Sequence, residues 1–343
     1  MKNCSIRYIE IVLYCLLITG SWLKPTQSSN LSPATFSNTL YYIFNESNTA
    51  QTSWHKEFYE HFTSLQTASN ITTPCSALTL KKKGVPTQYL DYMATLYTEL
   101  SQNTFISIFF PPTSNNLSKA IATLNEYGQV VYTKKIKLNQ KGFCNLLKLI
   151  YEVHHCNGWR EDMNGIYARY KNLLRLDHHE VSVVLWECSS LQRAIESKRK
   201  IRSIYDNHDN TVCHYTDKHH ETIYVSQSLF NENTVNFFNT KLNQNYKNLN
   251  KYLHQLQSTI KKHPELKDSY CIDTGGVLAA HGLRDCGDID LILDTSINNK
   301  FTNIGLNNAT RINYGFNIEE LIYNPNNFFY YKRLKFLSLK KVR

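Results

Sequence analysis

Two aspartates near the C-terminus, Asp288 and Asp290, have the spacing of ligands for a divalent metal. They open the run Asp288-Ile-Asp-Leu-Ile-Leu-Asp294, whose apolar residues are typical of a β-strand. Successive side chains of a strand point to opposite faces, so we expect both carboxylates on one face and Ile289 on the other. Carboxylate oxygens are ligands that Mg²⁺ and Mn²⁺ prefer. The spacing therefore predicts a magnesium or manganese site.

A glycine pair, Gly275-Gly276, precedes these aspartates by eleven residues. It follows Tyr270–Asp273, which we expect to be a strand, and we expect a tight turn at the glycines and a short helix over Val277–His281. Glycines at a helix start let backbone N–H groups approach a phosphate chain closely. A phosphate cradle beside paired carboxylates is the minimum requirement for metal-assisted transfer of a phosphorus-centred group.

The same stretch is unusually acidic. Five aspartates face a single basic residue, Arg284, within 22 residues. Such carboxylates repel one another unless a cation or a basic substrate neutralises them, which favours a metal site. The alternative is a purely structural role, in which Asp288 and Asp290 cap a turn and the glycines form an ordinary turn. The five aspartates are Asp273, Asp285, Asp288, Asp290 and Asp294.

This stretch resembles the nucleotidyltransferase fold of the DNA polymerase beta superfamily. The signature of that fold is a hydrophobic residue, Gly and then Gly or Ser, followed about ten residues later by acid, hydrophobic, acid, hydrophobic. Gly275-Gly276 and Asp288-Ile-Asp-Leu291 match both parts. The resemblance implies that the two glycines hold the phosphates of a nucleotide and that Asp288 and Asp290 are catalytic metal ligands. It covers about 75 of the 343 residues.

A looser likeness extends to multi-domain proteins of bacteria and large viruses that carry this module. They have a segment similar to Gly282–Asp285 before the carboxylate pair, and an Asn-Pro followed by an aromatic strand, similar to Asn324-Pro325 and Phe328–Tyr331. Those proteins are often linked with polysaccharide or surface-glycan synthesis. The likeness implies that Arg284 joins the glycines in binding the donor.

The sequence departs from the family pattern at one point. The fold normally places a third carboxylate on a later strand, but the only acids after Asp294 are Glu319 and Glu320, which we expect in a helix. Either Asp294 or one of these glutamates substitutes for the missing ligand, or the site is incomplete. The expected terminal strands carry basic residues instead, namely Lys332, Arg333 and Lys335.

Three functional hypotheses follow from these residues. The first is a transferase of the secretory pathway that uses a nucleotide or nucleotide-sugar donor with Mg²⁺ or Mn²⁺ and acts on a glycan or protein acceptor. Lumenal enzymes that resemble this fold, such as the fukutin family, transfer phosphorylated sugar alcohols. The second is a glycosyltransferase whose D-x-D motif is Asp288-Ile-Asp290. The third is a secreted binding protein with a catalytically degenerate module.

Residues 1–28 have the organisation of a secretory signal peptide. Lys2 and Arg7 precede the apolar segment Ile11–Ile18, and small residues follow it. The apolar run is shorter than the roughly 20 residues that span a bilayer, although an uncleaved signal anchor remains the alternative. We therefore expect the protein to be secreted or to lie in the lumen of the ER or Golgi. Glycosylation patterns N-x-[ST] occur at Asn30, Asn45, Asn70, Asn116 and Asn308.

Cysteine usage agrees with an oxidising compartment without fixing any pairing. Seven cysteines follow the predicted signal, which allows three disulfides and one odd thiol, although some of the seven could be buried core residues. No C-x-x-C pair is present, which disfavours a zinc ribbon. A histidine group followed by Glu221 could suggest zinc, but its spacing is not that of a metalloprotease helix. That group contains His208, His214, His219 and His220.

Composition indicates a globular protein that is polar but weakly charged. Apolar residues make up 42% and charged residues only 19%, and 8 prolines and 12 glycines exclude a collagen-like chain. Lys and Arg exceed Asp and Glu by 38 to 28, a net charge of +10. Because the basic residues are dispersed, we expect a nucleotide-activated small molecule and a glycan or protein acceptor as partners rather than nucleic acid.

Apolar runs and helical periods alternate along the chain and predict an α/β (α+β) fold. After the signal we expect a Ser/Thr/Asn-rich stem at 29–74 with a helix near Trp54–Leu65. A mixed α/β domain follows at 75–240, then a helical connector at 241–263 and the nucleotidyltransferase-like module at 264–343. Expected strands in the first domain are 105–110, 130–136, 181–186 and 211–215, and expected helices are 191–205 and 221–230.

Overall fold

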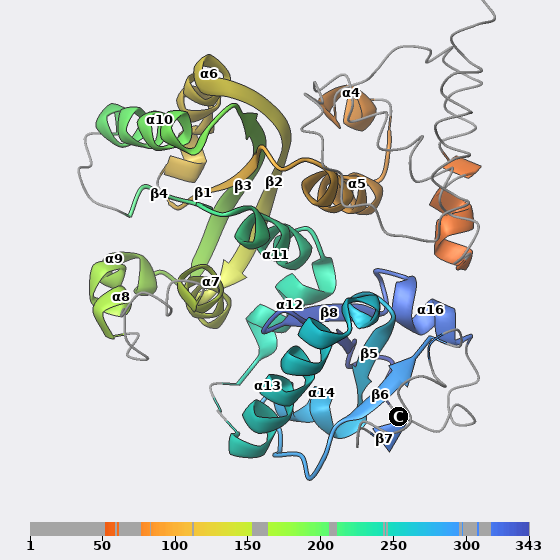
Figure 1. Ribbon diagram of the computed structural model, residues 1–343. Coiled ribbons are helices and arrows are strands. Elements are labelled where there is room, and N and C mark those ends of the chain that lie inside the picture. Colours follow the sequence, from red (N-terminus) through yellow and green to blue (C-terminus); the bar gives the residue numbers. More distant parts are fainter. Residues whose placement is uncertain are drawn as a thin grey trace, which may run out of the picture. The chain divides into compact units, whose positions relative to one another are not determined.

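The computed structural model shows an α+β protein with two separate β-sheets (Figure 1). All described residues belong to the compact unit Pro33–Arg343. The predicted signal at 1–28 and the glycosylation patterns at Asn30, Asn45 and Asn70 lie outside them, so those predictions stay predictions. The structure describes residues 52–58, 60–61, 77–82, 84–111, 113–152, 164–205, 211–242, 244, 246–294, 297, 307–308 and 317–342.

The first sheet contains four antiparallel strands in the order β2-β3-β1-β4. All four strands predicted for this part of the chain are confirmed, although β2 and β3 are longer than their apolar runs. Polar ends extend these two strands because backbone pairing runs from Gly128 opposite Cys188 to Asn139 opposite His178. The strands are β1 (Thr104–Phe109), β2 (Gly128–Asn139), β3 (His178–Cys188) and β4 (Cys213–Tyr215).

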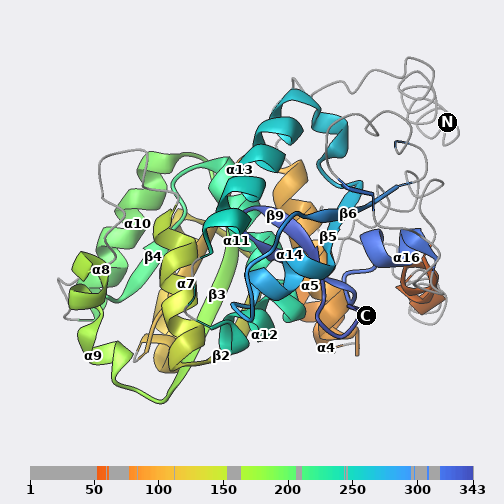
Figure 2. The same ribbon diagram turned by 90° about the horizontal axis from the view of Figure 1, so that it is seen from below.

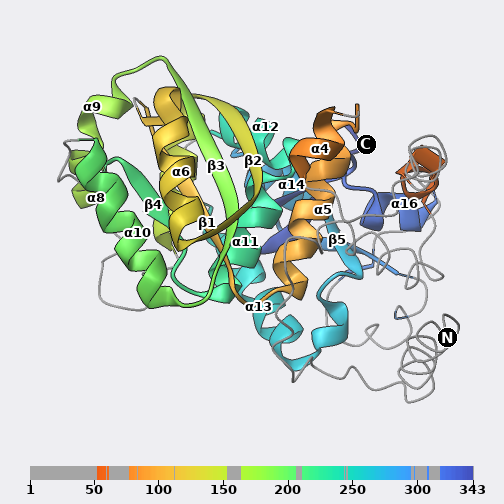
Figure 3. The same ribbon diagram turned by 90° about the horizontal axis from the view of Figure 1, so that it is seen from above.

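Helices cover both faces of this sheet, which explains why β1 is buried along its whole length. Phe105 and Phe109 belong to a cluster with side chains of α6 and α10, whereas Ile106 and Ile108 face the cluster that includes α7 and α11. Figures 1 and 3 show α6 and α10 together on one side of the strands. The period of two residues in β1 therefore sorts its side chains between two helical layers.

Most helices of this part were not predicted from the sequence pattern. The predicted helices at 191–205 and 221–230 are confirmed, and the predicted connector forms a helix only from Lys247. Ser190 and Asn231 cap α10 and α12 by accepting from backbone N–H groups. The helices are α4 (Ala77–Lys82), α5 (Thr87–Leu100), α6 (Leu117–Tyr127), α7 (Gln140–Glu152), α8 (Asn164–Arg169), α9 (Lys171–Leu174), α10 (Leu191–Ile204), α11 (His219–Leu229), α12 (Glu232–Thr240) and α13 (Lys247–Lys262).

The second sheet is mixed and has the order β7-β6-β5-β9-β8. β5 pairs antiparallel with β6 and parallel with β9, and β8 and β9 form the predicted terminal hairpin. Figures 1 and 2 show α14 between α13 and strands β5 and β6. The elements are β5 (Tyr270–Asp273), α14 (Thr274–Ala280), β6 (Asp290–Leu293), β7 (Asn307–Asn308), α16 (Ile318–Tyr323), β8 (Phe328–Tyr331) and β9 (Leu334–Leu337).

Part of the predicted stem is packed into the protein. Residues 53–58 are helical, and Trp54 and Phe58, one turn apart, are both almost fully buried. Their rings stack with centroids 5.5 Å apart and contact Tyr89 and Tyr92 of α5. The helix predicted near Trp54–Leu65 is thus present at these residues, and its two aromatic side chains at helical spacing pack it against α5 despite the polar composition around them.

None of the five described cysteines forms a disulfide, and the remaining two after the signal, Cys75 and Cys156, lie outside the described residues. Burial raises the pKa of Cys213 and of Cys286 to about 11, and it also raises that of Cys271. These thiols are core residues in the protonated form. In the part of the chain that the structure describes, no helix is both long and apolar enough to cross a membrane.

A buried ion pair connects α5 to the first sheet. The Lys134 ammonium donates to Asp91 Oδ2 at 2.7 Å, and the Tyr132 hydroxyl donates to Asp91 Oδ1 at 2.8 Å. The side chains of Lys134 and Asp91 are only 13% and 7% exposed. Both Asp91 oxygens thus have partners, which the carboxylate requires in a poorly hydrated site.

Replacing Lys134 by methionine should remove the counter-charge of a buried carboxylate. We expect Lys134→Met to lower the free energy of unfolding by about 3 kcal/mol. The matched control is Lys135→Met, because the Lys135 side chain is 57% exposed and loss of its surface pair with Glu180 should cost less than about 1 kcal/mol. Urea unfolding measures both, and equal losses for the two variants would contradict the role of the buried pair.

Candidate functional site

The turn from β5 into α14 fixes the start of the candidate site. Asp273 is fully buried and accepts from Thr274 N at 2.6 Å, so it caps the helix. Thr274 has a φ of +38°, a conformation that β-branched residues rarely adopt. Its hydroxyl donates to Asp290 Oδ2. Because Asp273 and Asp290 are also partners in the β5–β6 ladder, this turn and the second aspartate are positioned together.

The two glycines lie inside the first turn of α14, so the expected tight turn before the helix is wrong. A Cβ atom on Gly276 would lie 2.6 Å from Cγ2 of Ile272 and 3.3 Å from Cγ2 of Ile289. Gly276 is therefore required for the close approach of α14 to β5 and β6. A Cβ on Gly275 would meet Cys286 Cβ at 3.5 Å, an ordinary contact, and Asp288 O at 3.9 Å. Gly275, unlike Gly276, is available to face a ligand beside Asp288.

Asp288 and Asp290 alternate with a core residue as the sequence predicts. Asp288 is exposed, Ile289 is buried and Asp290 is half-buried. Pairing in β6 begins only at Asp290, so the strand is shorter than expected and Asp288 belongs to the preceding loop. The structure thus brings Gly275, Asp288 and Asp290 to the edge of the sheet where β5 ends and β6 begins.

Arg284 lies in the loop between α14 and β6 and is exposed. This loop is held by α13: the Tyr246 hydroxyl donates to Gly282 O at 3.0 Å, and the Tyr252 hydroxyl donates to Gly287 O. No sequence signal pointed to these tyrosines. Arg284 and Asp288 flank Cys286 at two residues on either side. Among the described residues, Arg284 forms no hydrogen bond with either glycine.

The other three aspartates of the acidic stretch have structural roles. Asp273 caps α14, as described above. Asp285 Oδ1 accepts from Cys286 N at 2.9 Å and from Leu249 N, in the first turn of α13, at 3.4 Å. Asp294 accepts from the Tyr323 hydroxyl at 2.6 Å. Three of the five aspartates thus support the fold, so the local excess of acid is a weaker argument for a metal site than the sequence suggested.

Asp294 and Glu320 are both engaged in the fold and do not supply the missing third carboxylate. Asp294 lies four residues beyond Asp290 along the strand direction, about 13 Å away. Glu320 accepts from Asn324 Nδ2 at 3.0 Å and from the Ser53 amide. Burial opposes ionisation of Glu320, but these hydrogen bonds outweigh it and hold its pKa below the usual value. Its charged carboxylate is committed to contacts within the fold.

The strand beside β6 carries asparagine where a third acid could have stood. β7 pairs in parallel with β6, and Asn307 is the backbone partner of Asp290. Within the described ranges, no group of three or more His, Cys, Asp or Glu side chains could hold a metal. Of the alternatives left open by the sequence, the described residues favour an incomplete carboxylate set.

The histidine group does not form a zinc site among the described residues. His214 is buried on β4, and its Nε2 lies 3.4 Å from Glu221 Oε1. Burial lowers the pKa of His214, although Glu221 opposes that shift. Glu221 also accepts from Asp217 N at 2.9 Å, which ties β4 to the start of α11. These contacts give His214 and Glu221 a structural role; His208 lies outside the described residues.

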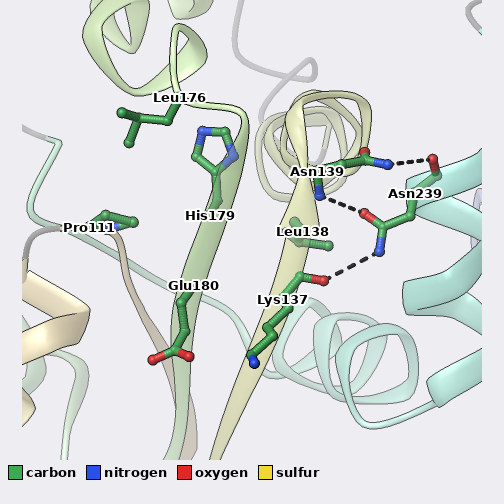
Figure 4. Close-up of a pocket in the computed structure, with 8 residues that line it drawn as sticks. All are labelled: Pro111, Lys137, Leu138, Asn139, Leu176, His179, Glu180 and Asn239. Atoms are coloured by element: carbon green, nitrogen blue, oxygen red, sulfur yellow. Dashed lines mark hydrogen bonds between the residues drawn. The ribbon is translucent and has the colours of Figure 1, made fainter.

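A separate pocket of about 650 Å³ lies at the end of strands β2 and β3 in the first sheet (Figure 4). Asn239 of α12 bridges its floor by donating to Lys137 O at 3.3 Å and accepting from Asn139 N at 2.9 Å. The His179 ring stacks on Phe143 with centroids 4.1 Å apart. The polar groups of this pocket support the packing of α12 and α7 on the sheet, and none belongs to the predicted site.

Comparisons with known proteins identify no relative of this chain. No protein-family model matches the chain, and neither the curated proteins nor the solved structures contain a significant match. The candidate site therefore rests on its own geometry.

The two glycines should respond differently to the same substitution. We expect Gly276→Ala to destabilise the fold by about 1–3 kcal/mol, because its Cβ would overlap Ile272. Gly275→Ala has room for its Cβ and should be neutral or slightly stabilising, since alanine favours a helix over glycine by up to about 1 kcal/mol. Denaturant unfolding distinguishes the two variants, and equal stability would refute the close approach at Gly276.

Proposed function

We propose that this protein is a transferase of the secretory pathway that uses a nucleotide-activated donor and a divalent metal. Asp288 and Asp290 are its metal ligands, and Gly275 faces the donor phosphates. The acceptor is a glycan or a protein. The observation that carries the proposal is the meeting of two carboxylates with the glycine start of a helix at one edge of a sheet, in the order that the sequence signature requires.

The two aspartate ligands fit Mg²⁺ or Mn²⁺, whose coordination would be completed by water and by phosphate oxygens of the substrate. Mg²⁺ keeps several waters and is commonly bound by one or two carboxylates together with substrate phosphates. Two aspartates on one face supply that number of protein ligands. Bound there, the ion would neutralise charge on the donor phosphates and hold them in position. A carboxylate set this small predicts weak metal binding that strengthens when the nucleotide is present.

Four residues around the proposed metal position have separate roles in this proposal. The Thr274 hydroxyl bonded to Asp290 fixes the orientation of that carboxylate. Asp288, two residues earlier and exposed, lies on the loop side and is accessible to solvent and substrate. Because Gly275 carries no side chain, its backbone can approach a donor phosphate closely. Arg284 on the same loop provides a positive charge for the donor.

A degenerate module that binds a nucleotide without transferring it is the second candidate. It is favoured by one observation, the pairing of Asp290 with Asn307 on the strand beside it. A binding module would keep nucleotide affinity but show no metal-dependent turnover. The glycosyltransferase alternative, with Asp288-Ile-Asp290 as its D-x-D motif, predicts instead that a nucleotide sugar binds better than the free nucleoside triphosphate.

Melting temperature measured with and without excess Mn²⁺ tests the metal site. Wild type should be stabilised by Mn²⁺ in the presence of nucleotide, because a ligand stabilises the state that binds it, by about 2.7 kcal/mol at a hundredfold excess over Kd. Asp288→Asn should abolish this rise.

The matched control is Asp285→Asn on the same loop. Loss of its bonds to Cys286 and Leu249 should lower the melting temperature at any Mn²⁺ concentration while preserving the metal-dependent rise. Identical melting curves for wild type with and without Mn²⁺ and nucleotide would contradict metal binding at this site.

Expression in a eukaryotic cell tests the proposed compartment. Asn116 is exposed at the start of α6, so oligosaccharyltransferase can reach it, and the chain should carry a glycan there that glycosidase removes. Asn116→Gln should reduce the apparent mass by one glycan. An unglycosylated product in the cytosol would contradict secretion.

A further inference from the structure

Helix α13 carries a row of basic side chains on the side that faces solvent. Its buried residues Leu249, Leu253 and Leu256 are at most 3% exposed and recur at helical spacing, which defines the inward side. Successive helical residues turn by about 100°, so positions 4, 7, 14 and 15 after Lys247 fall with it in an arc of about 100° on the opposite side. We call these exposed residues the basic stripe: Lys247, Lys251, His254, Lys261 and Lys262.

The four lysines of the basic stripe have no acidic partner on their own helix. The sequence contains no Asp or Glu between Glu232 and Glu265, although acids four residues away are the usual partners of exposed helical lysines. Among the described residues, none of the four forms an ion pair. Lys247 and Lys251, four residues apart, repel each other. An anionic ligand along the stripe would be attracted by every one of these charges.

Helix α13 also holds the loop that carries the candidate metal ligand Asp288. The Tyr252 hydroxyl donates to Gly287 O, and Leu249 N donates to Asp285 Oδ1 at 3.4 Å. Lys251 directly precedes Tyr252, so the basic stripe passes beside this loop. A long ligand that follows the stripe would therefore have one part next to the candidate site.

We propose that the basic stripe binds an acidic glycan, meaning a polysaccharide chain that carries sulfate, phosphate or carboxylate groups. The stripe runs the length of α13, whose 16 residues span about 24 Å, so it can contact several charged groups of one extended chain. Lysine ammonium groups bind anions as point charges and require no planar geometry. This inference rests on the proposed function, because it names the class of the glycan acceptor.

The composition of the stripe fits other anionic partners less well. Single-stranded nucleic acid is bound by basic grooves together with aromatic side chains on which bases stack, and the stripe contains no Phe, Tyr or Trp. A helix that lies in a membrane surface buries its apolar face in lipid, but the leucines of α13 are already buried in the core. A protein interface normally has an apolar centre, which the stripe lacks.

Calorimetric titration of the full chain with a heparin fragment, in the absence of metal and nucleotide, tests this surface. Wild type should bind heparin, and its affinity should fall as salt is raised, because binding releases counterions. Neutral dextran should not bind. The triple variant Lys247→Gln, Lys251→Gln, Lys261→Gln should bind heparin about tenfold more weakly. Arginine at the same three positions keeps the charge and should keep the affinity.

The matched control removes three exposed lysines from other helices, Lys81→Gln, Lys119→Gln and Lys141→Gln, and so loses the same net charge. It should bind heparin within about twofold of wild type, because distant surface charges are screened in salt. The proposal is overturned if wild type does not bind heparin, or if the two glutamine variants lose affinity equally. Tighter binding of oligothymidylate or of phosphatidylserine vesicles than of heparin would also overturn it, in favour of nucleic acid or of a membrane.

Heparin binding and the metal site can fail independently. The glutamine variant of α13 should keep the Mn²⁺-dependent rise in melting temperature, and Asp288→Asn should bind heparin at least as tightly as wild type. Loss of heparin affinity in Asp288→Asn would contradict binding at the stripe. Heparin binding by a wild-type protein that Mn²⁺ and nucleotide do not stabilise would leave the glycan surface in place and remove the metal site.

Discussion

The close approach of α14 to the second sheet at Gly276 is the constraint on which the candidate site depends. No side chain fits there, because a Cβ would lie 2.6 Å from Ile272. Since α14 follows β5 without an intervening loop, the helix can only dock this closely if Thr274 accepts a left-handed conformation. That conformation is accompanied by the hydrogen bond from Thr274 to Asp290. Packing, backbone strain and the orientation of the Asp290 carboxylate are thus one linked arrangement.

The sequence predicted those features that depend on local periodicity. The strands around Ile106 and Val183 and the terminal hairpin follow from their apolar runs, and the burial of Ile289 between Asp288 and Asp290 follows from alternation. Features that depend on contacts between distant segments could not be predicted in this way. The capping of α13 by Asp285 and the burial of Trp54 against α5 need the tertiary structure, and each changed the meaning of a sequence pattern.

Two glycines that looked equivalent in the sequence have separate roles in the structure. A glycine pair before a helix is read as a phosphate-binding feature, yet Gly276 satisfies a packing requirement and only Gly275 faces the loop of Asp288. The acidic stretch is divided in the same manner, because Asp273, Asp285 and Asp294 accept structural hydrogen bonds, whereas Asp288 and Asp290 are the proposed metal ligands.

The central claim is that Asp288 and Asp290 hold a divalent metal together with a nucleotide. Crystals of the protein grown with Mn²⁺ and a non-hydrolysable nucleotide, measured at the manganese absorption edge, test it most directly. The account predicts an anomalous peak within about 2–2.6 Å of oxygens from both aspartates and from a donor phosphate. A nucleotide bound elsewhere in the protein would contradict the account. So would the absence of manganese density at Asp288 and Asp290 when nucleotide is bound beside Gly275.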